Sequence, residues 1–169
     1  MSDIHVFAVS GFSGTGKTFL IGKLVQRLCE KGFSVGVVKR SEEDVLAPPD
    51  TDTRRHQDAG ANPVILLGPS TTTIRHRHRM KLYDAIGECE IDFLLLEGFK
   101  SSNVPRFWCI GNREEMLLSA PENTKVIVKW NKSGKGEDSN QIPIVTSDEV
   151  ETLLDIVEKD AILLSECEL

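Results

Sequence analysis

The sequence predicts an α/β fold of three layers, with a mostly parallel central sheet and a β-hairpin extension. Apolar runs of strand length alternate with longer amphipathic segments along most of the 169 residues, which is the order expected when helices cover a parallel sheet. A glycine-rich segment, residues 11–18, separates the first of these strands from the first helix. No linker interrupts the alternation, so we expect a single domain over residues 1–169.

In the first half of the chain, β-branched runs predict strands, and amphipathic segments that end at glycine predict helices. The glycine-proline-serine turn at 68–70 separates two short β-branched runs and therefore predicts the hairpin. The predicted elements are strand 4–10, helix 17–31 with Gly32 as its cap, strand 33–39, helix 53–60, strand 63–67 and strand 71–75.

The second half continues the pattern. Residues 91–98 form the most hydrophobic predicted strand, and we expect this strand to be central in the sheet. Ser147 is the expected N-cap of the last helix, since acids follow it in the first turn. The predicted elements are helix 79–88, strands 91–98, 107–110, 125–129 and 142–145, and a helix from Ser147 to about Lys159.

Residues 11–18 (GFSGTGKT) fit G-x-x-x-x-G-K-[ST], the phosphate-binding loop, called the phosphate loop below. Backbone N–H groups of such a loop cradle phosphate oxygens at the start of the following helix. Lys17 is expected to reach the β- and γ-phosphates and Thr18 to bind Mg²⁺. The motif and its context predict a P-loop NTPase fold whose nucleotide-binding residues include Gly11, Ser13, Gly14, Thr15, Gly16, Lys17, Thr18 and Phe19.

Two acidic residues are candidates for holding the metal ion. Glu97 lies at the end of the predicted 91–98 strand, at the edge where open α/β sheets bind ligands. It is therefore the acid expected to bind Mg²⁺ and to take part in catalysis. Asp52 follows the second strand and could bind Mg²⁺ as well, with Arg55 meeting the γ-phosphate. Lys17 and Asp52 are therefore predicted catalytic residues together with Glu97. A polar helix start with Asp52 as N-cap explains the same residues equally simply.

Asn131 and Lys132 follow the 125–129 strand and resemble the Asn-Lys-x-Asp guanine reader of GTPases. Gly134 replaces the aspartate of that motif, so the match is partial. The two residues are included in the predicted nucleotide site and favour guanine without deciding the base.

The run Arg75-His-Arg-His-Arg79 is basic in an acidic protein. It could receive an anionic ligand or an acidic partner, or it could protect an exposed edge strand by its charge. His76 and His78 would share a strand face, but no third metal ligand is evident in the sequence.

Composition excludes several functional classes. A net charge of −6 argues against nucleic-acid binding, and no apolar run reaches the length of a membrane span. No secretory signal pattern is present at the N-terminus, so we expect a cytoplasmic protein without membrane association.

Together, the phosphate loop, DTRRHQDAGA at 52–61 and LLLEGFK at 94–100 resemble the MobB family of molybdopterin-guanine dinucleotide biosynthesis adapter proteins. In that family the loop reads close to GxSGSGKTTL, followed by D-[ST]-x-R-H and EGFK blocks. An I-P-[IVL] strand before the final helix is matched at 142–145. By position, the phosphate loop, Asp52, Arg55, His56 and Glu97 carry over.

The resemblance implies a GTP-binding adapter that assists a guanylyltransferase of the MobA type in attaching GMP to molybdopterin. It also implies a homodimer and slow, Mg²⁺-dependent GTP hydrolysis, so the chain would be at most a weak GTPase. One alternative is a small-molecule kinase that transfers the γ-phosphate of ATP, with the 69–81 region as a lid. Another is a metallochaperone GTPase, which the lack of a clustered ligand set disfavours.

Overall fold

The computed structural model describes residues 3–87, 89–131 and 142–169. Backbone contacts divide the chain into two compact units. Residues 1–40 and 90–169 form the sheet unit, and residues 41–89 form the hairpin unit; each is described by itself. The single domain expected over 1–169 stays a prediction. Within the described residues, no helix combines the length and apolar character needed to cross a membrane.

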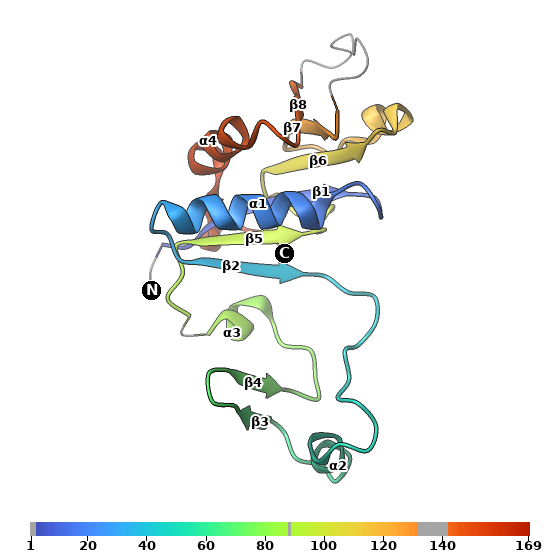
Figure 1. Ribbon diagram of the computed structural model, residues 1–169, viewed down its shortest axis with the longest axis vertical. Helices are drawn as coiled ribbons and strands as arrows, with labels where there is room; N and C mark the ends of the chain where they lie inside the picture. Colours follow the sequence, from blue (N-terminus) through green and yellow to red (C-terminus); the bar gives the residue numbers. More distant parts are fainter. Residues whose placement is uncertain (1–2, 88, 132–141) are drawn as a thin grey trace. The chain divides into compact units, whose positions relative to one another are not determined.

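The sheet unit contains most of the regular structure (Figure 1). Its helices are α1 (Lys17–Glu30) and α4 (Val150–Asp160), with two short 3-10 helices, η1 (Glu114–Ser119) and η2 (Leu164–Glu166). Its strands are β1 (His5–Gly11), β2 (Val35–Lys39), β5 (Phe93–Glu97), β6 (Arg106–Gly111), β7 (Thr124–Lys129), β8 (Ile144–Thr146) and β9 (Ile162–Leu163).

The sheet has the order β2-β5-β1-β6-β7-β8, and all neighbours along this path are parallel. Only β9 is antiparallel, against the start of β1. The predicted α/β class with a mostly parallel sheet is therefore confirmed. The predicted 91–98 strand is β5, and it is interior, as its apolar composition requires. Only β2 lies beyond it, whereas β1 has at least two strands on each side. Because the strands are parallel, the phosphate loop after β1 and the residues after β5, β6 and β7 emerge at one edge of the sheet.

Helices α1 and α4 pack on the same face of the sheet (Figure 1). Leucines of both helices are fully buried there against phenylalanines of β1 and β6, including the Phe7–Phe107 ring pair at 4.6 Å. The opposite face of β6 and β7 buries Trp108, Ile110 and Ile127 against η1. Helix α1, which follows the phosphate loop, is thus held by the core on one face of the sheet.

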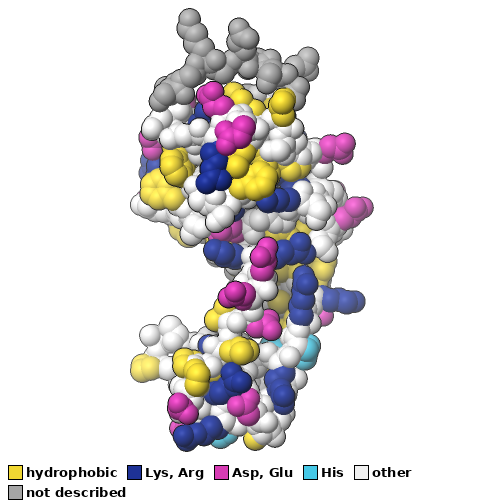
Figure 2. Space-filling view, turned by 90° about the vertical axis from the view of Figure 1, so that its right-hand side faces the viewer, with side chains coloured by type: hydrophobic (Ala, Val, Ile, Leu, Met, Phe, Trp, Pro, Cys, Tyr) yellow, Lys and Arg dark blue, Asp and Glu magenta, His cyan; other side chains and the backbone are white. Residues whose placement is uncertain are grey.

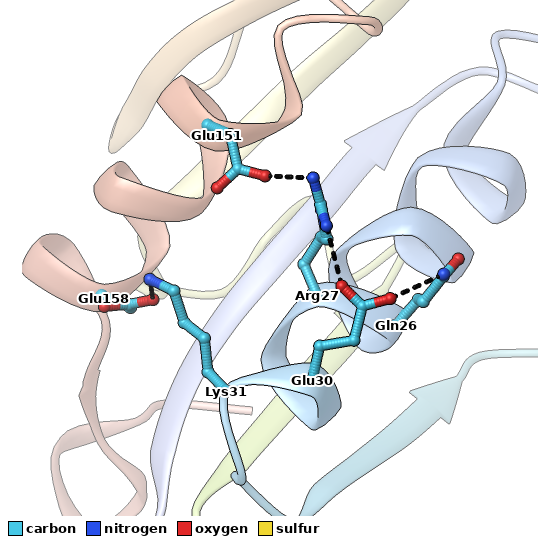
Figure 3. A network of polar contacts seen from close by, with 6 residues as sticks. All are labelled: Gln26, Arg27, Glu30, Lys31, Glu151 and Glu158. Carbon is cyan, nitrogen blue, oxygen red and sulfur yellow. Dashed lines mark hydrogen bonds and ion pairs between the residues drawn. The ribbon is translucent and has the colours of Figure 1, made fainter.

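A polar network also joins α1 to α4 at the surface (Figure 3). Arg27 pairs with Glu151 at 2.7 Å and with Glu30 at 2.8 Å, and Lys31 pairs with Glu158 at 2.5 Å. The hydrogen bond to Glu30 and the charge of Glu151 raise the pKa of Arg27. These pairs are exposed, so each contributes little to stability and is readily screened by salt.

Two helix starts differ from the sequence prediction. The last helix begins at Val150 with Glu149 in the cap position, and Ser147 is not its N-cap. The backbone N–H of Ser147 donates to the Lys129 carbonyl at 2.8 Å, which keeps this residue at the end of the sheet. In the hairpin unit, Thr51 rather than Asp52 caps the short helix, because its hydroxyl accepts from the Arg54 N–H at 3.2 Å.

The hairpin unit consists of α2 (Asp52–Asp58), β3 (Val64–Leu67), β4 (Thr72–Arg75) and α3 (Leu82–Ile86). Strands β3 and β4 pair antiparallel, so the predicted hairpin is confirmed. Helix α3 is shorter than the predicted 79–88, and Glu88 lies outside the described residues. Figure 2 shows hydrophobic side chains at the surface of this unit, and the exposed ones on the hairpin are Ile65, Leu66, Leu67 and Ile74.

Candidate functional site

The phosphate loop joins β1 to α1, as its motif predicts. Gly11 has a φ of +148°, and a Cβ atom on it would lie 2.3 Å from the Cys109 carbonyl oxygen. Gly16 has a φ of +87°, and a Cβ atom there would lie 2.4 Å from Nε1 of Trp130. Any larger residue at either position would clash and would hold a strained backbone. Glycine is therefore required here by the neighbouring β6 and β7 ends as well as by the loop.

Lys17 begins α1, and its ammonium group turns back over the loop. Its Nζ donates to the Phe12 carbonyl at 2.6 Å, and the Thr15 hydroxyl donates to the same oxygen at 2.8 Å. Burial lowers the pKa of Lys17 from its usual value, while the charge of Glu97 opposes the shift. A neutral carbonyl thus holds a partly desolvated cation, which a phosphate anion would stabilise more strongly.

This lowered pKa makes a testable prediction about pH. A bound triphosphate raises the pKa of Lys17. Above the pKa that Lys17 has in the free protein, triphosphate binding therefore requires the uptake of a proton. Triphosphate affinity should therefore fall as pH rises through that lowered pKa, by up to about tenfold per pH unit. Calorimetric titrations at a series of alkaline pH values measure it, starting above the range where terminal phosphates titrate, with a pKa of about 6.

Lys17→Arg is the matched control, because a guanidinium stays charged throughout this range. Its affinity should change less over the same interval. A wild-type affinity that stays flat would show that Lys17 does not meet the phosphates.

Glu97 is the last residue of β5, and the fold places it directly beside the phosphate loop. Its Oε1 accepts a hydrogen bond from the Thr18 hydroxyl at 3.0 Å and lies 3.3 Å from Nζ of Lys39. Only 9% of the Glu97 side chain is exposed. The parallel register explains the meeting, since Glu97 is opposite Val9 of β1 on one side and Lys39 of β2 on the other.

The Thr18 hydroxyl and the Glu97 carboxylate form an oxygen donor set that fits Mg²⁺. This ion is usually held in proteins by one or two carboxylates together with waters and substrate phosphates. Lys39 supplies the countercharge to Glu97 in this structure. Among the described residues, no group of three or more histidine, cysteine or acidic side chains could hold a metal by itself.

Arg106, a residue that the sequence did not single out, supports the segment after Glu97. It is fully buried, and its guanidinium donates to the Phe99 carbonyl at 2.9 Å and to the Ser102 carbonyl. The Ser10 hydroxyl also donates to the Gly98 carbonyl. These contacts link the strand before the phosphate loop to the glycine after Glu97. A fully buried arginine is visible only in the fold, because its sequence position reads as an ordinary strand start.

Two further residues flank the loop and were also missed. Trp130, directly after β7, donates from its indole Nε1 to the Thr15 carbonyl at 3.2 Å. Arg113, shortly after β6, brings a guanidinium nitrogen to 3.8 Å from where a Cβ atom of Gly14 would be. The sequence signal that could have identified Trp130 is its position immediately before Asn131.

Four further predicted site residues belong to the hairpin unit or follow β7 in the chain. Asp52 and Arg55 belong to α2 of the hairpin unit, where they pair with each other at 3.3 Å, and both are exposed. Asn131 is exposed after β7, and Lys132 lies outside the described residues. The roles given to these four residues stay predictions.

The basic run does not continue as a strand. Strand β4 ends at Arg75, whose guanidinium donates to the Val45 carbonyl at 3.0 Å. The rings of His76 and His78 lie 5.7 Å apart, and Nδ1 of His78 is 3.4 Å from the Asn62 amide nitrogen. The three arginines of the run therefore do not form one strand face.

Known proteins that are similar to this chain belong to one family. The family model described as molybdopterin guanine dinucleotide synthesis protein B (MobB) matches residues 6–135. Molybdopterin-guanine dinucleotide biosynthesis adapter protein of Haemophilus influenzae is 29% identical over 127 residues, which cover 72% of this chain and 70% of that protein. The probable adapter protein of Bacillus subtilis is 25% identical over 150 residues, covering 85% and 86% of the two chains.

Solved structures agree. The structure of Bacillus subtilis MobB superposes with a TM-score of 0.72 at 26% identity, covering 92% of this chain and 97% of that one. A MobB homologue from Bacillus stearothermophilus shares the fold, with a TM-score of 0.67 at 20% identity and coverage of 91% and 98%. The resemblance inferred from the sequence motifs is confirmed, and the chain belongs to the MobB family.

Proposed function

We propose that this protein is a GTP-binding adapter in molybdopterin guanine dinucleotide biosynthesis. It would bind GTP with Mg²⁺ at the phosphate loop and assist a guanylyltransferase in attaching GMP to molybdopterin. The observation that carries the proposal is the meeting of Lys17, Thr18 and Glu97 at the end of β1 and β5, in a chain of the MobB family.

The residues around the loop have separate tasks in this proposal. Backbone N–H groups of the loop and the start of α1 hold the phosphates. Lys17 exchanges the Phe12 carbonyl for phosphate oxygens, and its positive charge there neutralises part of the negative charge of the β- and γ-phosphates. Thr18 and Glu97 would hold Mg²⁺, which neutralises phosphate charge when bound. Glu97 then exchanges its Thr18 and Lys39 contacts for this role.

Slow hydrolysis is also part of the proposal. Fast GTPases use a glutamine to orient the attacking water and an arginine to stabilise the transition-state charge. The two glutamines that the structure describes are Gln26, which bonds Glu30 on α1, and Gln57, which belongs to the hairpin unit. Gln26 is thus occupied by Glu30 on the surface of α1, and in this proposal bound GTP persists long enough to act as a ligand.

The names of the relatives support the adapter role, since an adapter acts through a partner enzyme. A guanylyltransferase of the MobA type is the proposed partner, because guanine dinucleotide synthesis requires the transfer of GMP. The homodimer expected from the sequence resemblance is supported by the exposed apolar side chains of the hairpin. Each of Ile65, Leu66, Leu67 and Ile74 is more than half exposed.

Calorimetric titration with GTP and with ATP, each with and without Mg²⁺, tests the proposal. We expect Mg²⁺-dependent binding of GTP at least about tenfold tighter than that of ATP, which corresponds to roughly 1.4 kcal/mol. Co-sedimentation with a purified guanylyltransferase in the presence of GTP tests the adapter role. ATP preference together with acceptor-dependent ADP production would instead make the chain a small-molecule kinase.

A further inference from the structure

Trp130 occupies an unusual position at the edge of the sheet. Its backbone N–H donates to the Gly111 carbonyl at 3.2 Å, and its indole Nε1 donates to the Thr15 carbonyl at 3.2 Å. The ring lies so close to Gly16 that a Cβ atom there would be 3.3 Å from Cδ1 and 2.4 Å from Nε1. The indole therefore forms a wall of the phosphate loop at its helix end.

In spite of these contacts, 44% of Trp130 is exposed. Tryptophan is highly buried on average, and the chain's other tryptophan, Trp108, is only 2% exposed. A large aromatic surface is thus left accessible at the edge where the ligand phosphates would be held. Exposed indoles of this kind are typical of binding surfaces, because one ring offers a large and rigid contact area.

Two other aromatic rings near the loop are exposed, but a cation covers each. The Lys100 ammonium lies 4.1 Å from the centre of the Phe12 ring, and the Lys23 ammonium lies 4.5 Å from that of Phe19. In the part of the chain that the structure describes, no cation and no second ring stands over Trp130. Among these three rings, the Trp130 ring is the one that no described cation covers.

We propose that Trp130 is the platform on which the base of the bound nucleotide stacks. The inference rests on the proposed nucleotide site, since it concerns the end of the nucleotide that extends beyond the phosphate loop. Stacking on an aromatic side chain strengthens nucleotide binding by roughly tenfold or more per base. Such stacking gives affinity for any base, so the choice of guanine would rest on other groups.

The two tryptophans make a direct test possible. In a Trp108→Phe variant, Trp130 is the one remaining tryptophan, and its fluorescence reports contact with the base. We expect GTP with Mg²⁺ to quench this fluorescence in a saturable way. Inorganic tripolyphosphate, which has the phosphates without ribose or base, should bind and leave the fluorescence almost unchanged. Equal changes with both ligands would overturn the inference, because they would report a movement of the loop.

Substitution of Trp130 separates stacking from support of the loop. Trp130→Leu should weaken GTP binding by roughly tenfold more than it weakens tripolyphosphate binding. Trp130→Phe, which keeps an aromatic ring but loses the hydrogen bond to Thr15, should retain most of the GTP affinity. If Trp130→Leu weakens both ligands equally, Trp130 only supports the loop. If the wild-type protein binds tripolyphosphate but not GTP, or neither, the proposed function fails as well, so the two failures can be distinguished.

Discussion

Lys17→Ala is expected to weaken GTP binding by at least about a hundredfold, which corresponds to roughly 2.7 kcal/mol. The substitution removes the cation nearest the expected phosphate position, and hydrogen bonds to charged groups contribute about 1.5–3 kcal/mol each. The Phe12 carbonyl that the ammonium bonds also accepts from the Thr15 hydroxyl, so the loss of the ammonium should leave the backbone cradle in place. Calorimetric titration with GTP and Mg²⁺ measures the loss.

Lys31→Ala is the matched control for this change. Lys31 follows the same helix and pairs with Glu158 at the surface, away from the phosphate loop. This variant should bind GTP like the wild type. Lys17→Ala should unfold at the wild-type temperature or above it, since burial disfavours the charged form of this lysine. Wild-type affinity in Lys17→Ala would mean that nucleotides do not bind at this loop.

Glu97→Gln is expected to abolish the increase in GTP affinity that Mg²⁺ brings. A neutral amide is a poor Mg²⁺ ligand in a site with so few protein donors. The amide oxygen can still accept from the Thr18 hydroxyl, so the local geometry should survive. Titrations with GTP, with and without Mg²⁺, should give nearly equal affinities in the variant and at least about tenfold different affinities in the wild type.

Stability separates this effect from misfolding. The substitution leaves Lys39 without its anion, but the Lys39 side chain is 62% exposed, so the free energy of unfolding should fall by less than about 1 kcal/mol. Glu30→Gln makes the same chemical change on the surface of α1 and should keep the full Mg²⁺ effect. Retention of that effect in Glu97→Gln would remove Glu97 from the metal site.

Local pattern predicted the part of the fold that contains the phosphate loop. The G-x-x-x-x-G-K-T spacing, the apolar run before it and the amphipathic run after it predicted β1 and α1 to within one residue at each end. Gly32 has a φ of +93°, as expected for a residue that ends a helix. The hairpin was equally accessible, because its turn residues and β-branched strands are contiguous in the chain.

Ser147 shows where local pattern failed. Its type and the acids after it are those of an N-cap, but its backbone N–H is bonded to Lys129 of the neighbouring strand. Glu149, two residues later, accepts from both the backbone N–H and the hydroxyl of Thr146. A contact between distant segments thus overrode the local preference, and the helix begins later than expected.

The candidate site divides in the same way. Lys17 and Thr18 could be named from sequence, because a phosphate loop is a contiguous motif whose backbone and helix start form the site. The contact of Glu97 with Thr18 and Lys39, the support of its loop by Arg106 and the packing of Trp130 on Gly16 depend on which strands become neighbours. Sheet order and register, set by the burial of the whole core, decide these contacts, and no short stretch of sequence contains that information.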